Sequence, residues 1–228
     1  PSMIKSSQEN WFTEVFGDEG TAFGLAVIEK LHQEQTRYQY LEIYQTRTFG
    51  KLMVLDGCVM LTERDNFLYH EMMSHPALFT HPEPKRVAII GGGDCGTLRE
   101  VLKHPGVEKC TQIDIDERVT WAAEKWFPEL CDANHDPRAE LLFDDGIAWV
   151  RNAAPGSLDV IIIDSIRNDG EVKTLRQFPY FYLVSIHANE DLRLKRTLKM
   201  KKFKDEAEFH DADMRDREEE VHYGQQVK

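Results

Sequence analysis

Glycine and aspartate residues follow four apolar segments in the middle of the sequence. The turn Gly91-Gly92-Gly93-Asp94 follows the first segment, and Asp114, Asp145 and Asp164 stand at or just after the ends of the next three. Glycines between a strand and a helix allow a ligand to approach the backbone closely. Asp114 comes 23 residues after Gly91, near the spacing of about 20 at which a carboxylate meets ribose hydroxyls. Each acid alone would also fit a helix N-cap, but their clustering favours a nucleoside site.

The charges in this cluster indicate which kind of nucleoside would bind. No segment matches the G-x-x-x-x-G-K-[ST] pattern of phosphate-binding loops, and Asp94 within the glycine turn would repel a pyrophosphate. A nucleoside without phosphates and with a positive charge, such as a sulfonium of the S-adenosylmethionine type, fits better. Because Asp94 would also disfavour a ligand carboxylate, we expect a decarboxylated sulfonium rather than the cofactor of a methyltransferase.

The spacing of apolar residues predicts the elements that position these acids. Apolar segments alternate with helical segments between residues 86 and 163, which indicates a parallel sheet with helices on each side. Short strands before residue 62, joined at Asp56-Gly57, indicate a small antiparallel sheet. The predicted fold class is therefore α/β, a Rossmann-like (methyltransferase-type) parallel sheet with an N-terminal antiparallel β region. The expected strands are Tyr38–Tyr44, Lys51–Leu55, Val59–Leu61, Arg86–Ile90, Cys110–Ile115, Glu140–Phe143 and Leu158–Ile163, and the expected helices are Phe67–Leu78, Thr97–Leu102, Val119–Phe127 and Gly146–Arg151.

Three regions follow from this pattern. Residues 1–65 form the N-terminal β-strand region, and residues 66–188 form the Rossmann-like nucleoside-binding domain, with Tyr180–Ala188 as a fifth strand. Residues 189–228 are densely charged with few apolar anchors, which predicts a charged helical tail.

The net charge and the lengths of the apolar runs indicate which kinds of binding partner to exclude. The 228 residues include 28 Lys and Arg against 40 Asp and Glu, a net charge of −12. An excess of acid argues against nucleic acid and anionic membranes, and no apolar run reaches the roughly 18–20 residues of a membrane span. The four scattered cysteines indicate reduced thiols, so we expect a cytoplasmic protein. We expect no metal site, because His75 is one residue too late to form an H-E-x-x-H pair with His70-Glu71.

Residues 11–165 resemble the spermidine synthase (polyamine aminopropyltransferase) family. The motifs that carry the resemblance are Tyr38-Gln39, the run from Leu55 to Asp65, Tyr69-His70-Glu71-Met72, Gly91-Gly92-Gly93-Asp94, Leu98-Arg99-Glu100-Val101, Asp145-Gly146 and Asp164-Ser165. The family's activity would be transfer of the aminopropyl group of decarboxylated S-adenosylmethionine to putrescine, with release of methylthioadenosine. The resemblance also implies self-association into a homo-oligomer and no cofactor beyond the sulfonium co-substrate.

The resemblance assigns roles to particular residues. Asp94 would bind the aminopropyl ammonium, Asp114 the ribose and Asp145 the adenine amino group. Tyr69, His70 and Asp164 would face putrescine. Asp164 would be the general base, assisted by Tyr69, because a diamine is mostly protonated at neutral pH and must lose a proton before it attacks. The full set expected to bind the decarboxylated nucleoside is Gln39, Gly91, Gly93, Asp94, Asp114, Asp145 and Gly146.

Two positions depart from the family pattern. Cys95 stands where the family usually has glycine, and a cysteine would be strained there if the position needs a positive φ. Arg167 stands where the family has a second acid, beside the expected diamine. Residues 166–228 do not match the family and weakly resemble the C-terminal part of a P-loop nucleotide kinase-like domain. The alternative to an active aminopropyltransferase is therefore a nucleoside-binding pseudoenzyme or chimera without a complete diamine site.

Overall fold

The computed structural model describes residues 10–16 and 20–164, which belong to one compact unit. The predicted tail, the strand expected at Tyr180–Ala188 and Arg167 lie outside the described residues. Within the described residues, no helix is both long enough and apolar enough to cross a membrane.

The N-terminal part is a five-stranded antiparallel sheet in the order β1-β2-β3-β4-β5. Asp56 and Gly57, with φ of 50° and 82°, form the tight turn between the last two strands, as the sequence predicts. The strands are β1 (Asn10–Phe16), β2 (Thr21–Gln35), β3 (Tyr40–Thr46), β4 (Lys51–Leu55) and β5 (Cys58–Thr62).

Strand β2 corrects the expectation that this region contains only short strands, since it runs for 15 residues. Its pairing with β3 shifts register between Val27 and Glu29 and again between Lys30 and His32. Each irregularity breaks the alternation of apolar and polar side chains, because an extra residue moves the following side chains to the other face. The strand therefore lacks the period of two from which strands are predicted.

The second part is a four-stranded parallel sheet in the order β8-β7-β6-β9. The fold class predicted from the sequence is confirmed, because each strand and helix expected between residues 66 and 163 is present within about two residues of its expected bounds. Its strands and helices are α1 (Asn66–Thr80), β6 (Arg86–Ile90), α2 (Gly96–Leu102), β7 (Lys109–Asp114), α3 (Glu117–Trp126), the short 3₁₀ helix η1 (Pro128–Leu130), β8 (Ala139–Phe143), α4 (Gly146–Asn152) and β9 (Val160–Ile163).

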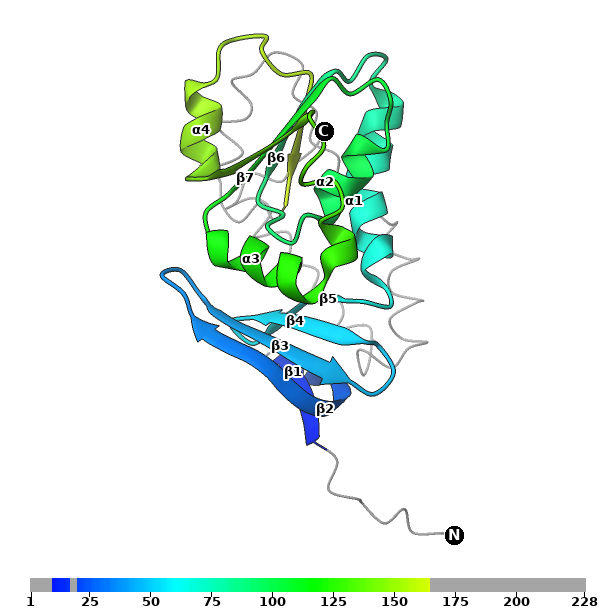
Figure 1. Ribbon diagram of the computed structural model, residues 1–228, viewed down its shortest axis with the longest axis vertical. Coiled ribbons are helices and arrows are strands. Elements are labelled where there is room, and N and C mark those ends of the chain that lie inside the picture. The colour runs from blue at the N-terminus through cyan, green and yellow to red at the C-terminus, as the bar shows by residue number, and fades with distance from the viewer. Residues whose placement is uncertain (1–9, 17–19, 165–228) are drawn as a thin grey trace, which may run out of the picture. The chain divides into compact units, whose positions relative to one another are not determined.

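Helices cover both faces of the parallel sheet (Figure 1). Leu78 of α1 and Leu98 of α2 pack with Ile89 of β6 in one buried cluster. Gly146, the first residue of α4, lies against Ile90, whose side chain points to the opposite face of the strand. This arrangement leaves the carboxyl ends of the strands, where the acids stand, as one edge of the sheet.

Helix α3 also carries the contact with the antiparallel sheet. Ile43 and Met53 of that sheet lie in one buried cluster with Val119 and Ala122 of α3. At the margin of this cluster, Arg118 donates two hydrogen bonds of 2.8 and 2.9 Å to Glu34, the penultimate residue of β2. The turn after β2 is thereby held beside the N-terminus of α3.

Candidate functional site

The glycine turn after β6 holds two aspartates close to the backbone. Gly91 has a φ of +83°, and a Cβ atom added there would stand 3.2 Å from the Cβ of Asp164. A Cβ added at Gly93 would stand 2.9 Å from the carboxyl carbon of Asp114, closer than side chains pack. Side chains at these two positions would therefore push Asp164 and Asp114 out of place.

Asp114 is a carboxylate bound by backbone amides. Its Oδ2 accepts a hydrogen bond of 2.9 Å from the amide of Gly93, and its Oδ1 accepts one of 2.8 Å from the amide of Asp116. Burial raises the pKa of Asp114 above its ordinary value, although both amide hydrogen bonds act in the opposite direction. The two amide hydrogen bonds therefore fix the positions of both carboxylate oxygens.

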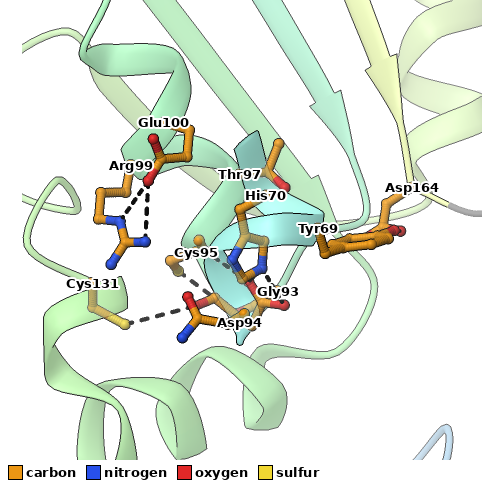
Figure 2. A network of polar contacts seen from close by, with 12 residues as sticks. Tyr69, His70, Gly93, Asp94, Cys95, Thr97, Arg99, Glu100, Cys131 and Asp164 are labelled. Carbon is orange, nitrogen blue, oxygen red and sulfur yellow. Dashed lines mark hydrogen bonds and ion pairs between the residues drawn. The ribbon is translucent and has the colours of Figure 1, made fainter. Parts of the chain in front are cut away.

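Asp94 and His70 form a first pair of side chains in contact (Figure 2). Nε2 of His70 lies 3.1 Å from Oδ1 and 3.3 Å from Oδ2 of Asp94, and Oδ1 also accepts a hydrogen bond of 2.7 Å from the amide of Gly96. His70 is only 1% exposed. A Cβ added at Gly96 would stand 2.2 Å from the imidazole ring, so the absence of a side chain at Gly96 makes room for His70.

Tyr69 and Asp164 form a second pair, next to the first (Figure 2). The Tyr69 hydroxyl donates a short hydrogen bond to Oδ1 of Asp164, and the Tyr69 ring meets the His70 ring edge-on at 5.7 Å. Burial raises the pKa of Tyr69, and the negative charges of Asp164 and Asp94 raise it further. Tyr69 therefore stays a phenol that donates a hydrogen bond throughout the neutral range.

Asp145 and Gly146 mark the start of α4. Oδ1 of Asp145 accepts hydrogen bonds of 2.9 Å from the amide of Ile147 and 3.0 Å from that of Ala148, so this residue is a helix N-cap. Both cap bonds go to one oxygen. A Cβ added at Gly146 would stand 2.6 Å from Cγ2 of Ile90, and this close approach brings the cap to the sheet edge.

Gln39 reaches the same edge from the antiparallel sheet through Asp116, which is not among the predicted site residues. Its Nε2 donates a hydrogen bond of 3.0 Å to Oδ2 of Asp116, which also accepts one of 2.7 Å from the Thr36 hydroxyl. Asp116 in turn donates its amide to Asp114. A weak signal was available for Asp116, because an aspartate shortly before a predicted helix is an N-cap candidate and Asp116 lies three residues before the helix expected from Val119. Thr36 gave no comparable indication.

Cys95 has a positive φ, the conformation in which a cysteine is expected to be strained. Its φ is +69° and its thiol is fully buried, at the residue before α2. Gln112 donates from Nε2 to its Sγ at 3.6 Å. A residue other than glycine in this left-handed conformation costs roughly 1–2 kcal/mol, so the turn stores strain beside Asp94.

The histidine that follows His70 on α1 belongs to a different contact. Nδ1 of His75 lies 2.9 Å from Nε2 of His104, and its Nε2 lies 3.3 Å from the buried Glu100. Residues 10–16 and 20–164 contain no group of three or more His, Cys, Asp or Glu side chains arranged to hold a metal ion.

Comparison with protein families gives two consecutive matches. Residues 10–63 match the spermidine synthase tetramerisation domain, and residues 66–194 match the spermine/spermidine synthase domain. The second match extends past Ser165, which corrects the expectation that the family likeness ends at that residue. The weak resemblance of residues 166–228 to a nucleotide kinase-like domain finds no support in either match.

Curated relatives and solved structures agree with these matches. The polyamine aminopropyltransferase of Thioalkalivibrio sulfidiphilus is 71% identical over 160 residues, which are 70% of this chain and 56% of that protein. The polyamine aminopropyltransferase of Alkalilimnicola ehrlichii is 68% identical over 157 residues, which are 69% of this chain and 55% of that protein. Thermotoga maritima spermidine synthase superimposes with a TM-score of 0.70 at 37% identity, over 76% of this chain and 61% of that chain.

A second solved structure, a spermidine synthase in complex with the transition state analogue AdoDATO, has a TM-score of 0.67 at 38% identity. That match covers 73% of this chain and 56% of that one. The chain thus spans little more than half the length of the curated relatives that it matches.

Proposed function

The chain belongs to the spermine/spermidine synthase family, and on that premise we propose that it is an aminopropyltransferase. It transfers the aminopropyl group of decarboxylated S-adenosylmethionine to putrescine and releases methylthioadenosine. The observation that carries the proposal is the arrangement of two adjacent pairs, Tyr69 with Asp164 and His70 with Asp94, at the sheet edge that also holds Asp114. An acidic edge of this kind attracts both a sulfonium and a diamine.

The donor would lie along the glycine turn. Asp94 would bind the ammonium of the aminopropyl group, and Asp114, fixed by two amides, would bind the ribose hydroxyls. Asp145 caps α4 with Oδ1, which leaves Oδ2 to accept from the adenine amino group. Gly91, Gly93 and Gly146 would serve the site indirectly, because their lack of a side chain makes room for Asp164, Asp114 and Ile90. Gln39 would contact the nucleoside from the other side.

The acceptor amine would lie between Tyr69, His70 and Asp164. The attacking ammonium first gives a proton to the Asp164 carboxylate, whose position the Tyr69 hydroxyl fixes. The freed amine nitrogen then attacks the carbon next to the sulfonium. The carbon–nitrogen bond forms as the carbon–sulfur bond breaks, and the sulfur takes the bonding electron pair. Methylthioadenosine leaves as a neutral thioether, and the product carries the positive charge as a secondary ammonium.

Methylthioadenosine release by the purified chain tests this function. We expect turnover with decarboxylated S-adenosylmethionine and putrescine, and a loss of about 10²- to 10⁴-fold in Asp164→Asn, the range for removal of a general base. Asp159→Asn is the matched control, because Asp159 bonds to Arg86 at the start of β6, at the other end of the strand from the glycine turn. No product from the wild-type chain, or equal rates for wild type and Asp164→Asn, would contradict the proposal.

The same preparation distinguishes an active enzyme from the pseudoenzyme, which Arg167 brings into consideration. A pseudoenzyme would be stabilised by methylthioadenosine in a thermal-shift titration and would not respond to putrescine. An active enzyme would respond to putrescine once methylthioadenosine is bound.

We further propose that the chain forms a homo-oligomer through residues 10–63, works in the cytoplasm and needs no metal or organic cofactor. The match to a tetramerisation domain supports the first point. So do the large apolar side chains that the antiparallel sheet exposes, Trp11, Val15, Phe23 and Ile28. Sedimentation of the wild-type chain and of Val15→Asp tests it, and a wild-type monomer would overturn it.

A further inference from the structure

We propose that Asp116 is a positioning residue that sets which end of the Gln39 amide faces the nucleoside. This inference rests on the proposed function, because it concerns the donor site of that reaction. Asp116 is 2% exposed and stands two residues after Asp114. It therefore acts on the ligand through Gln39 and Asp114 rather than by touching it.

The two carboxylate oxygens of Asp116 have separate tasks. Oδ1 accepts a hydrogen bond of 3.1 Å from the amide of Arg118 and caps α3. Oδ2 accepts from the Thr36 hydroxyl at 2.7 Å and from Nε2 of Gln39 at 3.0 Å. One oxygen serves the helix, and the other holds the turn that carries Gln39.

Thr36 has only one direction in which its hydroxyl can donate. Its oxygen already accepts from the amides of Tyr38 at 3.0 Å and Gln39 at 3.1 Å, so its proton points to Asp116. The amide of Thr36 also donates to the carbonyl of Gln39 at 2.9 Å, which closes the turn. The backbone of Gln39 is thus fixed by the same network that binds its side chain.

The orientation of the Gln39 amide follows from the chemistry of its partner. An ionised carboxylate only accepts hydrogen bonds, so the NH₂ end of Gln39 faces Asp116 and the carbonyl oxygen lies at the opposite end. A carbonyl oxygen turned to the donor site favours a positive sulfonium over a neutral thioether. Because Asp116 also donates its amide to Asp114, it joins the two sides of the nucleoside site.

Other contacts hold the antiparallel sheet on α3 without the Oδ2 bonds. The buried cluster that includes Ile43 and Ala122 and the double hydrogen bond between Arg118 and Glu34 do not involve Asp116. Asparagine is also as good an N-cap as aspartate. We therefore expect Asp116→Asn to fold with Oδ1 still capping α3, and with an NH₂ group in place of Oδ2.

In Asp116→Asn the new NH₂ group faces both the Thr36 hydroxyl and the NH₂ of Gln39, so the Thr36 hydrogen bond is lost and the Gln39 amide rotates to present its oxygen to Asn. Its own NH₂ then faces the donor site, which reverses the preference for a cation. Calorimetry should show decarboxylated S-adenosylmethionine binding weakened about tenfold, and methylthioadenosine binding changed by no more than about twofold. In a Gln39→Ala background, Asp116→Asn should leave the ratio of the two affinities unchanged.

Thr36 gives a second pair of variants, in case Asp116→Asn does not fold. Thr36→Val removes the hydroxyl that holds the turn and should lower the same affinity ratio, whereas Thr36→Ser keeps the hydroxyl and should keep the ratio. A ratio that stays at the wild-type value in Asp116→Asn and in Thr36→Val would overturn this inference alone. A wild-type chain that binds neither ligand would overturn the proposed function together with it.

Discussion

The Tyr69 hydroxyl donates a hydrogen bond to Asp164, although the two residues are 95 positions apart in the chain. Tyr69 lies in the first turn of α1 and Asp164 directly follows β9. The contact therefore depends on the packing of α1 beside the parallel sheet. It gives the proposed base a fixed donor on one oxygen, which orients the carboxylate for the proposed acceptor amine.

Removal of this donor should change the pH dependence of the reaction. Tyr69→Phe takes away a hydrogen bond that stabilises the charged form of Asp164, so the carboxyl group holds its proton to higher pH. We expect the acidic limb of the kcat profile to move to higher pH and the rate at neutral pH to fall about 10- to 100-fold. Rates of Tyr69→Phe and wild type measured across the pH range check this, and an unmoved acidic limb would contradict it.

Because His70 fills the space beside Gly96 and no atom lies near Gly106, alanine should be destabilising at Gly96 and tolerated at Gly106. Gly96→Ala should cost about 1–3 kcal/mol of unfolding free energy, because the added methyl group would meet the imidazole ring at 2.2 Å. It should also lower activity, since a displaced His70 no longer contacts Asp94. Gly106→Ala is the matched control. No atom lies within 4 Å of a Cβ at Gly106, so its stability should stay within about 0.5 kcal/mol of wild type. Urea unfolding of both variants measures these free energies, and equal stabilities for Gly96→Ala and Gly106→Ala would contradict the expected clash with His70.

The left-handed backbone at Cys95 should reverse the usual order of alanine and glycine. Cys95→Ala loses the buried sulfur and keeps the strain of a φ of +69°. Cys95→Gly loses slightly more packing and is relieved of roughly 1–2 kcal/mol of strain. Urea unfolding should therefore rank Cys95→Gly as at least as stable as Cys95→Ala. A clear advantage for Cys95→Ala would show that the strain has been relieved by other means.

Asp114 should make stability fall as the pH rises. Because burial raises its pKa in the folded chain, the folded state binds the proton more tightly than the unfolded state does. This stabilising contribution is complete below the unfolded pKa of about 3.9 and is lost as the pH rises through the folded value. The stability of wild type relative to Asp114→Asn should therefore decrease from about pH 4 upward. Chemical denaturation of both chains across that interval measures it; a flat or increasing difference would contradict the prediction.

Continuous apolar segments made the parallel sheet predictable. Strands β6 and β9 are apolar over most of their length because helices cover the sheet, and acids stand at or just after strand ends, as Asp114 and Asp164 illustrate. The hairpin at Asp56-Gly57 was predictable because few residues adopt its positive φ values. Strand β2 was not, since its register shifts interrupt the alternation of side chains.

Contacts between distant segments could not be derived from spacing. Gln39 and Asp116 are 77 residues apart, and nothing in either local sequence indicates that they meet. The family resemblance placed Gln39 at the donor site, but it gave no partner for the amide. The close approach of Gly96 to His70 is likewise visible only after α1 and α2 have packed together.

Because α3 and the antiparallel sheet share one buried core, the N-terminal β-strand region is part of the same folding unit as the parallel sheet. Removing this region would expose the faces of Val119, Ala122 and Phe127 to water and would take away Gln39, which is proposed to contact the nucleoside. The two sheets should accordingly unfold as one cooperative unit, and a shortened chain that starts at α1 should neither stay folded nor retain its ligand.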